Sequence, residues 1–488
     1  MRRPSRIGII NLCLVAFALA LLGRAAWVQL WQGSAWAARA ARQHFAATPA
    51  PAPRGDLLDA TGARLAESRE MLRLAVAPRE VREAGALRRA LANAGIAASW
   101  IARASDKRRA WVQLPGNYAP LTVAPALALR GVYAEPVSER VYPTTPGMLA
   151  LIGRVDESGK GVGGIEMALD SLLRGSSGAS NLLRDARGRR FESPTSPGQA
   201  PTKGHTVALT LNGELQSICE RALADAVAQL GASGGDIVVL DPHDGAVLAL
   251  ASRRSGATGA VTALTEPFEP GSTVKPLVAA ALLAGGHVED DDVVPTHGGR
   301  LTLDGRTITD VHKTSGRLSL GDVIRYSSNV GIVQFASRLE PREQFESLRD
   351  FGFGAPTGVV FPAEAAGRLR APKEWSRLSP ASLAMGYELA VTPLQLALAY
   401  AAIANGGELI EPALVREIRD ADGDVVYRHE RRVVRRVVST GIANRVRTML
   451  GDVVQRGTGM QADLATFSVA GKTGTARRAA DGSYAAGR

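Results

Sequence analysis

The first long apolar stretch of the chain runs from Ile7 to Leu22 and continues through apolar and aromatic residues to Trp31. Its length approaches the roughly 20 residues that a helix needs to cross a bilayer. Arginines within the first six residues favour a cytoplasmic start. The pattern predicts a cytoplasmic tail at residues 1–6 and a transmembrane anchor at residues 7–31. A cleaved signal peptide is the alternative, but no convincing small-residue cleavage site precedes a polar start.

Two proline-rich breaks divide the remaining chain, at residues 48–53 and 193–204. The first break is expected to be an extended spacer. Between them, the residue pattern predicts a strand at 72–76 and a helix at 81–94. This part contains no cluster of catalytic residue types. We therefore expect a non-catalytic, positional domain of mixed strands and helices over residues 40–195.

The pattern changes in the second half of the chain, where strand and helix periodicities alternate. The predicted elements are a strand at 207–211, a helix at 214–230, strands at 236–241 and 246–251, a helix through 395–405 and a strand that ends at Gly474. A Pro-His-Asp-Gly turn joins the middle two strands, so they should pair as a hairpin of a central antiparallel sheet. The expected fold class is α+β, with the second domain over residues 205–488.

Composition excludes several functions. The 488 residues carry a net charge of +11, but the arginines are scattered and no regular aromatics lie among them, so a nucleic-acid surface is not expected. The two cysteines, Cys13 and Cys219, lie in different regions and predict no disulfide framework. The histidines show no metal-ligand spacing, and the glycine-rich stretches lack a phosphate-binding lysine. We therefore expect no metal and no cofactor.

Three short motifs occur in an informative order: Ser272-Thr-Val-Lys275, Ser327-Ser-Asn329 and Lys472-Thr-Gly474. Lysine is rare in this chain, so its presence in two of the motifs is unlikely to be accidental. A serine followed three residues later by a lysine is common by chance, but the ordered set of three is not. The set is typical of penicillin-sensitive acyl transfer through a serine.

The first motif has the residues of an activated nucleophile. Pro276 is tolerated only in the first turn of a helix, so the helix should begin at or just before Ser272, at the positive end of its dipole. Lys275 would lie on the same face and accept the serine proton, which requires a neutral amine. Burial and the charge of Lys472 could lower its pKa from near 10.4 to about 7. Alone, the motif could equally be a helix cap and a solvated lysine.

The second motif suits proton relay and positioning. The Ser327 hydroxyl could pass a proton between Lys275 and a leaving group. The Asn329 amide could hold a substrate carbonyl and position the lysine. Taken by itself, a Ser-Ser-Asn segment is equally typical of a turn or a helix cap.

The third motif suits binding of a substrate carboxylate. Lys472 supplies a charge, and Thr473 and Thr475 supply hydroxyls. Gly474 leaves room for an acyl substrate to lie along the expected strand. The backbone N–H groups of Ser272 and Thr475 are the expected oxyanion hole.

The chain resembles the monofunctional class B penicillin-binding proteins, and especially the division-type peptidoglycan D,D-transpeptidases. The resemblance extends over nearly the whole chain. Beyond the three motifs it rests on Arg54–Asp59, Arg140–Pro143, Gly161–Glu166, Leu209–Gln216, Gly352–Gly354 and Val391–Gln395. It implies a single membrane anchor, a non-catalytic pedestal, also called the dimerisation domain, and a transpeptidase domain outside the cytoplasm. The expected location is the bacterial cytoplasmic membrane.

The resemblance also implies an activity and its partners. The enzyme would transfer the acyl group of a D-Ala-D-Ala stem peptide to Ser272 and then to a neighbouring stem, in septal synthesis, and β-lactams would acylate it. Carried over by motif, Lys275 is the base, Ser327 and Asn329 are the relay, and residues 472–475 bind the substrate. Other membrane proteins of cell-wall synthesis are the expected partners.

Two alternatives to this activity remain. Family members continue beyond the Lys-Thr-Gly strand with strands that complete the sheet, whereas this chain ends at Arg488. The resemblance therefore implies a fragment or a truncated homologue, and the truncated product could be an inactive scaffold of the division or elongation complex. A D,D-carboxypeptidase would use the same serine and lysine. The region before residue 205 is too short for both a pedestal and a glycosyltransferase domain.

Overall fold

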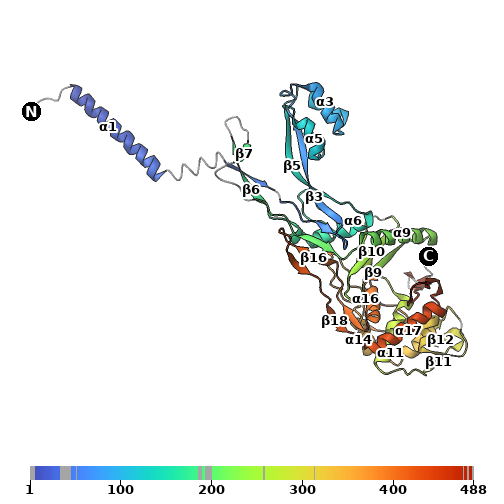
Figure 1. The fold of residues 1–488 in the computed structure, drawn as a ribbon. Coiled ribbons are helices and arrows are strands. Elements are labelled where there is room, and N and C mark those ends of the chain that lie inside the picture. Colours follow the sequence, from blue (N-terminus) through green and yellow to red (C-terminus); the bar gives the residue numbers. More distant parts are fainter. Residues whose placement is uncertain are drawn as a thin grey trace, which may run out of the picture. The chain divides into compact units, whose positions relative to one another are not determined.

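The computed structural model describes residues 6–32, 45–50, 52–184, 190–192, 200–256, 259–312, 314–475, 478–480 and 483–485. Most of the predicted cytoplasmic tail lies outside the described residues. The chain forms two compact units. The first contains Met1–Pro53 and Gly175–Lys203, and the second contains Arg54–Arg174 and Gly204–Arg488. Figure 1 shows the elements of each unit.

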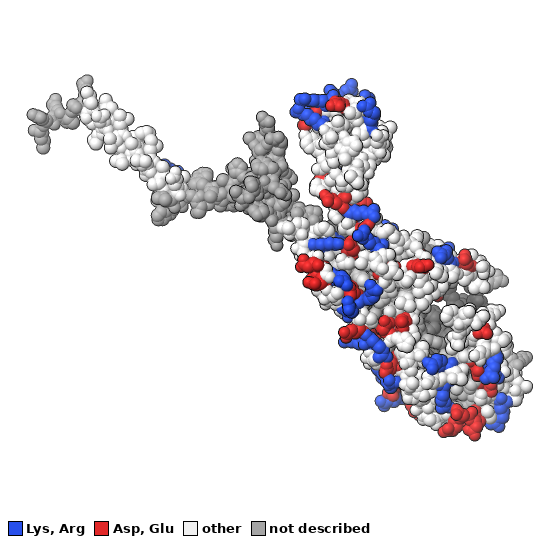
Figure 2. All heavy atoms as spheres, viewed as in Figure 1, with Lys and Arg blue, Asp and Glu red and all other residues white. Residues whose placement is uncertain are grey.

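A helix in the first unit corresponds to the predicted anchor. Helix α1 (Arg6–Ala26) continues into a π-helical turn, η1 (Trp27–Trp31). The span Ile7–Gln29 is long and apolar enough to cross a membrane, and none of it is buried within the protein. Figure 2 shows that the visible face of α1 is nearly free of charged side chains. An apolar surface on a helix that packs against nothing suits a lipid environment.

The first unit also contains a small antiparallel sheet. Strand β1 (Phe45–Ala50) pairs with β6 (Gly178–Arg184), which pairs with β7 (Arg190–Glu192). The expected spacer at residues 48–53 is therefore wrong in part, because its first residues belong to β1. Proline is accepted in a strand at a sheet edge, where its missing N–H leaves no ladder bond unmade.

A seven-stranded sheet runs through the second unit. Its path is β17 (Val425–Arg428), β16 (Val415–Arg419), β8 (Thr206–Leu209), β2 (Leu57–Leu58), β3 (Arg64–Val76) and β4 (Val112–Gln113), with β5 (Val132–Val141) also paired to β3. The β2–β8 pair is parallel and the others are antiparallel. Strand β3 is longer than the predicted strand at 72–76. Its central residues are charged and solvent-exposed, and they mask the apolar pattern.

Three helices cover one end of this sheet. They are α3 (Ala84–Asn93), α4 (Ala98–Ser105) and α5 (Pro120–Leu127). Leu74 and Val76 of β3 and Leu87 and Leu91 of α3 are fully buried in the resulting core. The predicted helix at 81–94 is α3, and Leu74 and Val76, two residues apart on one face of β3, share a core with its buried leucines.

Buried ion pairs hold the base of this region together. Arg54 Nε lies 2.6 Å from Glu166 Oε2, and Arg54 Nη1 lies 2.7 Å from Asp170 Oδ1. Arg140 Nε lies 2.8 Å from the other oxygen of Glu166. Glu166 is wholly buried and lies in α7 (Gly164–Ala168). Three motif segments that are distant in sequence therefore meet at one carboxylate.

The predicted hairpin and the helix before it are confirmed. Strands β9 (Gly234–Leu240) and β10 (Val247–Arg254) pair antiparallel, and α9 (Gly213–Leu230) packs on them. The Asn212 side chain caps α9 by accepting from the Leu215 N–H, and Gly231 ends it in the left-handed region at φ 60°. These local signals explain why the sequence predicted this part well.

A helical layer completes the second unit beside the hairpin (Figure 1). Its larger helices are α11 (Lys275–Ala284), α12 (Leu320–Tyr326), α13 (Asn329–Ala336), α14 (Pro341–Asp350), α16 (Pro393–Ala404) and α17 (Thr440–Arg456). They enclose an apolar core that contains Phe335, Phe351 and Phe353.

The second unit also contains shorter elements besides these helices and the seven-stranded sheet. Its remaining short helices are α6 (Pro146–Ile152), α8 (Asp170–Leu173), α10 (Thr262–Thr265) and α15 (Ser379–Ala384). Its remaining short strands are β11 (Val293–Pro295), β12 (Arg300–Leu303), β13 (Arg306–Thr309), β14 (Arg317–Ser319), β15 (Glu408–Ile410), β18 (Val433–Arg436), β19 (Arg478–Ala480) and β20 (Ser483–Ala485).

The strand predicted to end at Gly474 does not form. Residues 463–475 contain no strand, and Gly471 donates its N–H to Leu450 O of α17. A strand needs a neighbour to pair its backbone N–H and C=O groups. Among the described strands, β9 pairs only with β10. The local pattern was strand-like, but the described residues offer no partner for it.

Candidate active site

A tight turn carries Ser272. The 3-10 helix η2 (Gly271–Val274) leads directly into α11, and Pro276 lies in the first turn of α11. The expectation that helical structure begins just before Ser272 is therefore confirmed. Gly271 donates its N–H to Gly386 O at 3.0 Å. A Cβ atom on Gly386 would lie 1.9 Å from Gly271 O, so only glycine permits this contact.

Lys275 is wholly buried, and its amine contacts the second motif. The Nζ atom lies 2.6 Å from Ser327 O, 2.8 Å from Asn329 Oδ1 and 3.4 Å from Ser327 Oγ. Its hydrogen-bond partners in the described structure do not include the Ser272 hydroxyl. A neutral amine that donates to Ser327 O and Asn329 Oδ1 keeps its lone pair free to accept a proton.

Burial and charge make Lys275 unusually acidic. Its pKa is lowered to about 7, first because burial disfavours the charged amine and second because the Lys472 charge repels it. The Asp310 carboxylate acts in the opposite direction. Burial also lowers the pKa of Lys472, to about 8. The direction and causes predicted for Lys275 from the sequence agree with this environment.

The second motif is a strained turn between two helices. Ser327 ends α12 at φ 59°, in the left-handed region, and the Ser328 hydroxyl caps α13 by accepting from the Gly331 N–H. Asn329 Nδ2 donates to Thr309 O at 2.9 Å, which fixes its amide with Oδ1 toward Lys275. One N–H of this amide remains for another acceptor.

The third motif also contacts Ser327. Lys472 Nζ donates to Ser327 Oγ at 2.9 Å and to Thr473 O at 2.9 Å. The Thr473 hydroxyl lies 2.8 Å from that of Thr458. Gly474 passes so close to η2 that a Cβ on it would lie 2.8 Å from the methyl group of Thr273. Thr475 is solvent-exposed.

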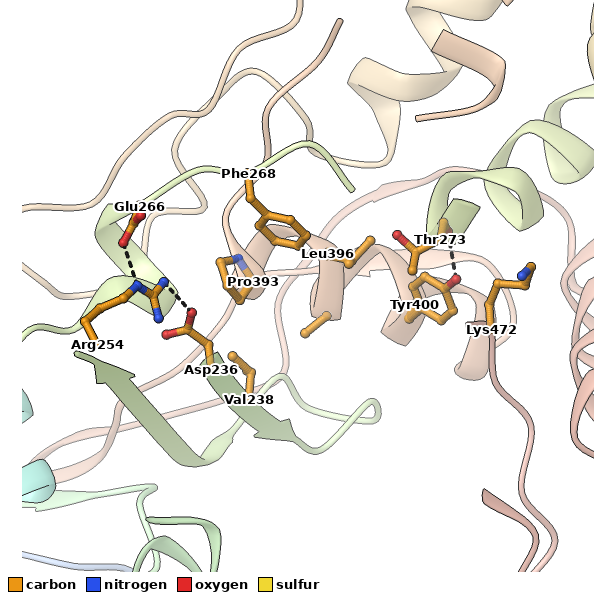
Figure 3. A pocket seen from close by; sticks show the side chains of 11 residues that line it. Asp236, Val238, Arg254, Glu266, Phe268, Thr273, Pro393, Leu396, Tyr400 and Lys472 are labelled. Carbon is orange, nitrogen blue, oxygen red and sulfur yellow. Dashed lines mark hydrogen bonds and ion pairs between the residues drawn. The ribbon is translucent and has the colours of Figure 1, made fainter. Parts of the chain in front are cut away.

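A cavity of about 490 Å³ opens beside Lys472 (Figure 3). Strand β9 and helix α16 line it, together with Thr273 and Lys472. The Tyr400 hydroxyl, on α16, donates to Thr273 O at 2.7 Å, next to Ser272 in the chain. At the far end, Arg254 pairs with Asp236 and Glu266. The described residues contain no group of three or more side chains able to hold a metal ion.

Comparison with known proteins identifies the family. The family model "Penicillin binding protein transpeptidase domain" matches residues 235–487, and the model "Penicillin-binding Protein dimerisation domain" matches residues 49–209. The chain belongs to the penicillin-binding proteins. The apolar span at Ile7–Gln29 fits a single-pass membrane anchor for this penicillin-binding protein.

The similarity to named relatives covers nearly the whole chain of this penicillin-binding protein. It is 32% identical over 506 residues to the probable peptidoglycan D,D-transpeptidase PbpC of Pseudomonas aeruginosa, covering 99% of this chain and 86% of PbpC. It is 29% identical over 501 residues to the peptidoglycan D,D-transpeptidase FtsI of Escherichia coli, covering 98% of this chain and 82% of FtsI.

A solved structure supports the same assignment. Penicillin-binding protein 3 of Mycobacterium tuberculosis, solved in complex with aztreonam, superposes with a TM-score of 0.67 at 28% identity, covering 89% of this chain and 84% of that chain. The α+β architecture, with an apolar N-terminal helix, a pedestal and a transpeptidase domain, agrees with the predicted fold class.

Several residues of this penicillin-binding protein's site carried no sequence signal. Thr309 and Asp310 contact the Ser327–Asn329 turn from the end of β13. Tyr400 and Gly386 contact the turn that carries Ser272. These contacts join residues that are distant in sequence, and each of them uses at least one backbone group that every residue possesses, apart from the bond between Asp310 and the Ser328 hydroxyl.

Proposed function

We propose that this chain is a peptidoglycan D,D-transpeptidase that works through an acyl-serine at Ser272. The observation that carries the proposal is the environment of Lys275: a wholly buried amine with a pKa near 7, held by Ser327 and Asn329 one helical turn from a serine. A serine becomes a useful nucleophile when a nearby base takes its proton, and a lysine serves as that base only when it is neutral at the working pH.

In the proposed acylation, Ser272 Oγ attacks the carbonyl carbon of the penultimate D-alanine while its proton passes to the Lys275 amine. The peptide C–N bond then breaks, and the terminal D-alanine leaves with a proton relayed from Lys275 through the Ser327 hydroxyl. That hydroxyl accepts from Lys472 at 2.9 Å and from the protonated Lys275 at 3.4 Å, so its own proton is free to pass to the leaving nitrogen. Attack by the amine of a second stem reverses the proton path and releases the cross-linked product.

Substrate binding is assigned to the third motif. The Lys472 charge, with the hydroxyls of Thr473 and Thr475, would hold the terminal carboxylate, and Gly474 would let the peptide backbone lie close. Backbone N–H groups of Ser272 and Thr475 would stabilise the tetrahedral oxyanion. The half-buried position of Lys472 supports this role, because a partly desolvated ammonium binds a carboxylate more strongly than an exposed one.

The proposed substrates and partners follow from the family. The donor and acceptor are D-Ala-D-Ala stem peptides, and β-lactams acylate the same serine. With arginines before the apolar span, the N-terminus would remain in the cytoplasm and the two domains would lie in the periplasm or outside the cell. We assign the protein to septal synthesis with other membrane proteins of cell-wall synthesis, on the division-type motifs and the likeness to FtsI.

Covalent labelling tests the nucleophile. The full chain, in membranes, is incubated with a fluorescent penicillin and separated on a denaturing gel. We expect a labelled band that disappears with Ser272→Ala and persists with Ser337→Ala, an exposed serine at the end of α13. Labelling that survives Ser272→Ala would reject Ser272. An unlabelled parent chain would instead favour the inactive scaffold.

A peptide assay separates transfer from hydrolysis. A donor that ends in D-Ala-D-Ala is supplied together with an acceptor amine, and the products are identified by mass. We expect the aminolysis product to depend on Ser272. Release of the shortened acid alone would make the protein a D,D-carboxypeptidase.

A further inference from the structure

Asp310 contacts the second motif without belonging to any motif. It follows β13 directly and is buried. Its Oδ1 accepts the N–H groups of Asn329 at 2.5 Å and Val330 at 2.9 Å, and its Oδ2 accepts the Ser328 hydroxyl at 2.7 Å. One carboxylate therefore binds three consecutive residues at the start of α13.

These bonds hold a turn that the backbone alone disfavours. Ser327 has a φ of 59°, in the left-handed region that is unfavourable for a residue other than glycine. The adjacent Thr309 carbonyl accepts from the Asn329 side chain. The end of β13 thus fixes both the backbone and the amide of Asn329, and so fixes the oxygens that bind Lys275.

Asp310 also supplies the negative charge that acts on Lys275. Among the described residues, the charges that shift the pKa of Lys275 are Lys472, which lowers it, and Asp310, which raises it. They act from different segments, because Lys472 lies in the third motif and Asp310 lies at the end of β13. Removing the carboxylate would leave Lys275 beside Lys472 without that compensation.

We propose that Asp310 is a positioning residue of the acylation reaction: its carboxylate anchors the Ser327–Asn329 turn and balances the two lysines between which the Ser327 hydroxyl lies. This inference rests on the proposed function for its catalytic consequence. The anchoring itself does not depend on that function, so it can be tested separately.

The key variant is Asp310→Asn, which keeps the shape and removes the charge. Its matched control is Asp304→Asn, an exposed aspartate in the β12–β13 turn, where asparagine also tolerates the positive φ of 46°. The rate of acylation by a fluorescent penicillin is measured between pH 5.5 and 9.5 on the full chain. For Asp310→Asn we expect the maximal rate to fall about tenfold to a hundredfold.

The pH profile separates positioning from a general loss of structure. The acylation rate should rise with pH as Lys275 loses its proton, and this part of the profile is its rising limb. Loss of the Asp310 charge lowers the pKa of Lys275. The rising limb should therefore move to lower pH in Asp310→Asn and stay in place in Asp304→Asn. Ser328→Ala removes one bond to Asp310 and the cap bond to the Gly331 N–H, but it keeps the Asp310 charge. We expect a slower reaction with an unshifted limb for that variant.

Hydrogen exchange tests the anchoring without any reaction. The amides of residues 327–331 should exchange at least about tenfold faster in Asp310→Asn than in Asp304→Asn, at matched melting temperature. If Asp310→Asn does not fold, Ser328→Ala should show the same faster exchange. The proposal would be overturned if all variants and the parent had the same amide exchange rates, the same acylation rates and the same position of the rising limb. An unlabelled parent with faster exchange in the variants would reject the proposed function while retaining the anchor.

Discussion

Lys275 and Lys472 share one hydroxyl: Ser327 Oγ lies 3.4 Å from the Lys275 amine and 2.9 Å from the Lys472 amine. Two ammonium groups this close repel each other, and both are removed from bulk water. The lower pKa belongs to the more buried Lys275, at about 7, and the higher to Lys472, at about 8. Between these two values the site can hold a neutral Lys275 amine beside a charged Lys472 ammonium, as the proposed roles of the two lysines require.

This difference predicts a bell-shaped pH dependence of acylation. The rate should rise with pH through about 7, as Lys275 loses its proton, and fall above about 8, as Lys472 loses its charge. The measurement is the rate constant of labelling by a penicillin with a free carboxylate. A rate that is flat between pH 6 and 9 would contradict the assignment of both lysines.

Lys472→Met should weaken the reaction and also shift its pH dependence. Loss of the substrate's cationic partner should reduce acylation on the order of a hundredfold. Removing the charge also raises the pKa of Lys275, so the rising limb should move to higher pH, opposite to the effect expected for Asp310→Asn. Lys373→Met, at an exposed lysine, serves as the control and should leave rate and limb unchanged. A lower rate with an unmoved limb would show that Lys472 binds substrate without influencing Lys275.

Glu166→Ala should destabilise the second unit. The change leaves Arg54 and Arg140 without their shared buried carboxylate, and breaking such a pair costs about 3–5 kcal/mol of unfolding free energy. Glu346→Ala removes the exposed partner of Arg342 and should cost less than about 0.5 kcal/mol. Denaturant unfolding of the full chain in detergent measures both. Equal stability of the two variants would mean that the buried ion pairs contribute no more than surface pairs.

The sequence predicted those parts of the fold that rest on local signals. The hairpin β9–β10 and helix α9 carry their own turn and cap residues, and Pro276 locates the start of α11. The strand at residues 472–474 was predicted wrongly, because strand formation depends on a neighbouring strand. The full length of β3 was missed because charged residues occupy its middle.

The motifs identified the lysines and serines of the candidate site but not their support. Asp310 is 19 residues before Asn329 and accepts its backbone N–H. Because nearly every residue type has this group, the sequence does not mark it as a partner. Tyr400 likewise binds the Thr273 carbonyl from 127 residues away. Such contacts depend on how the chain folds back on itself, and no periodicity or spacing encodes them in a single sequence.

The contacts of Ser327 span a long stretch of the chain, since its partners Lys275 and Lys472 lie 52 residues before it and 145 residues after it. No short fragment could bring these three side chains together. Covalent labelling by a penicillin should therefore act as a conformational reporter, marking only molecules whose distant segments have assembled. A label count divided by the total protein would give the natively folded fraction directly in cells, and would reveal variants that are made but misassembled.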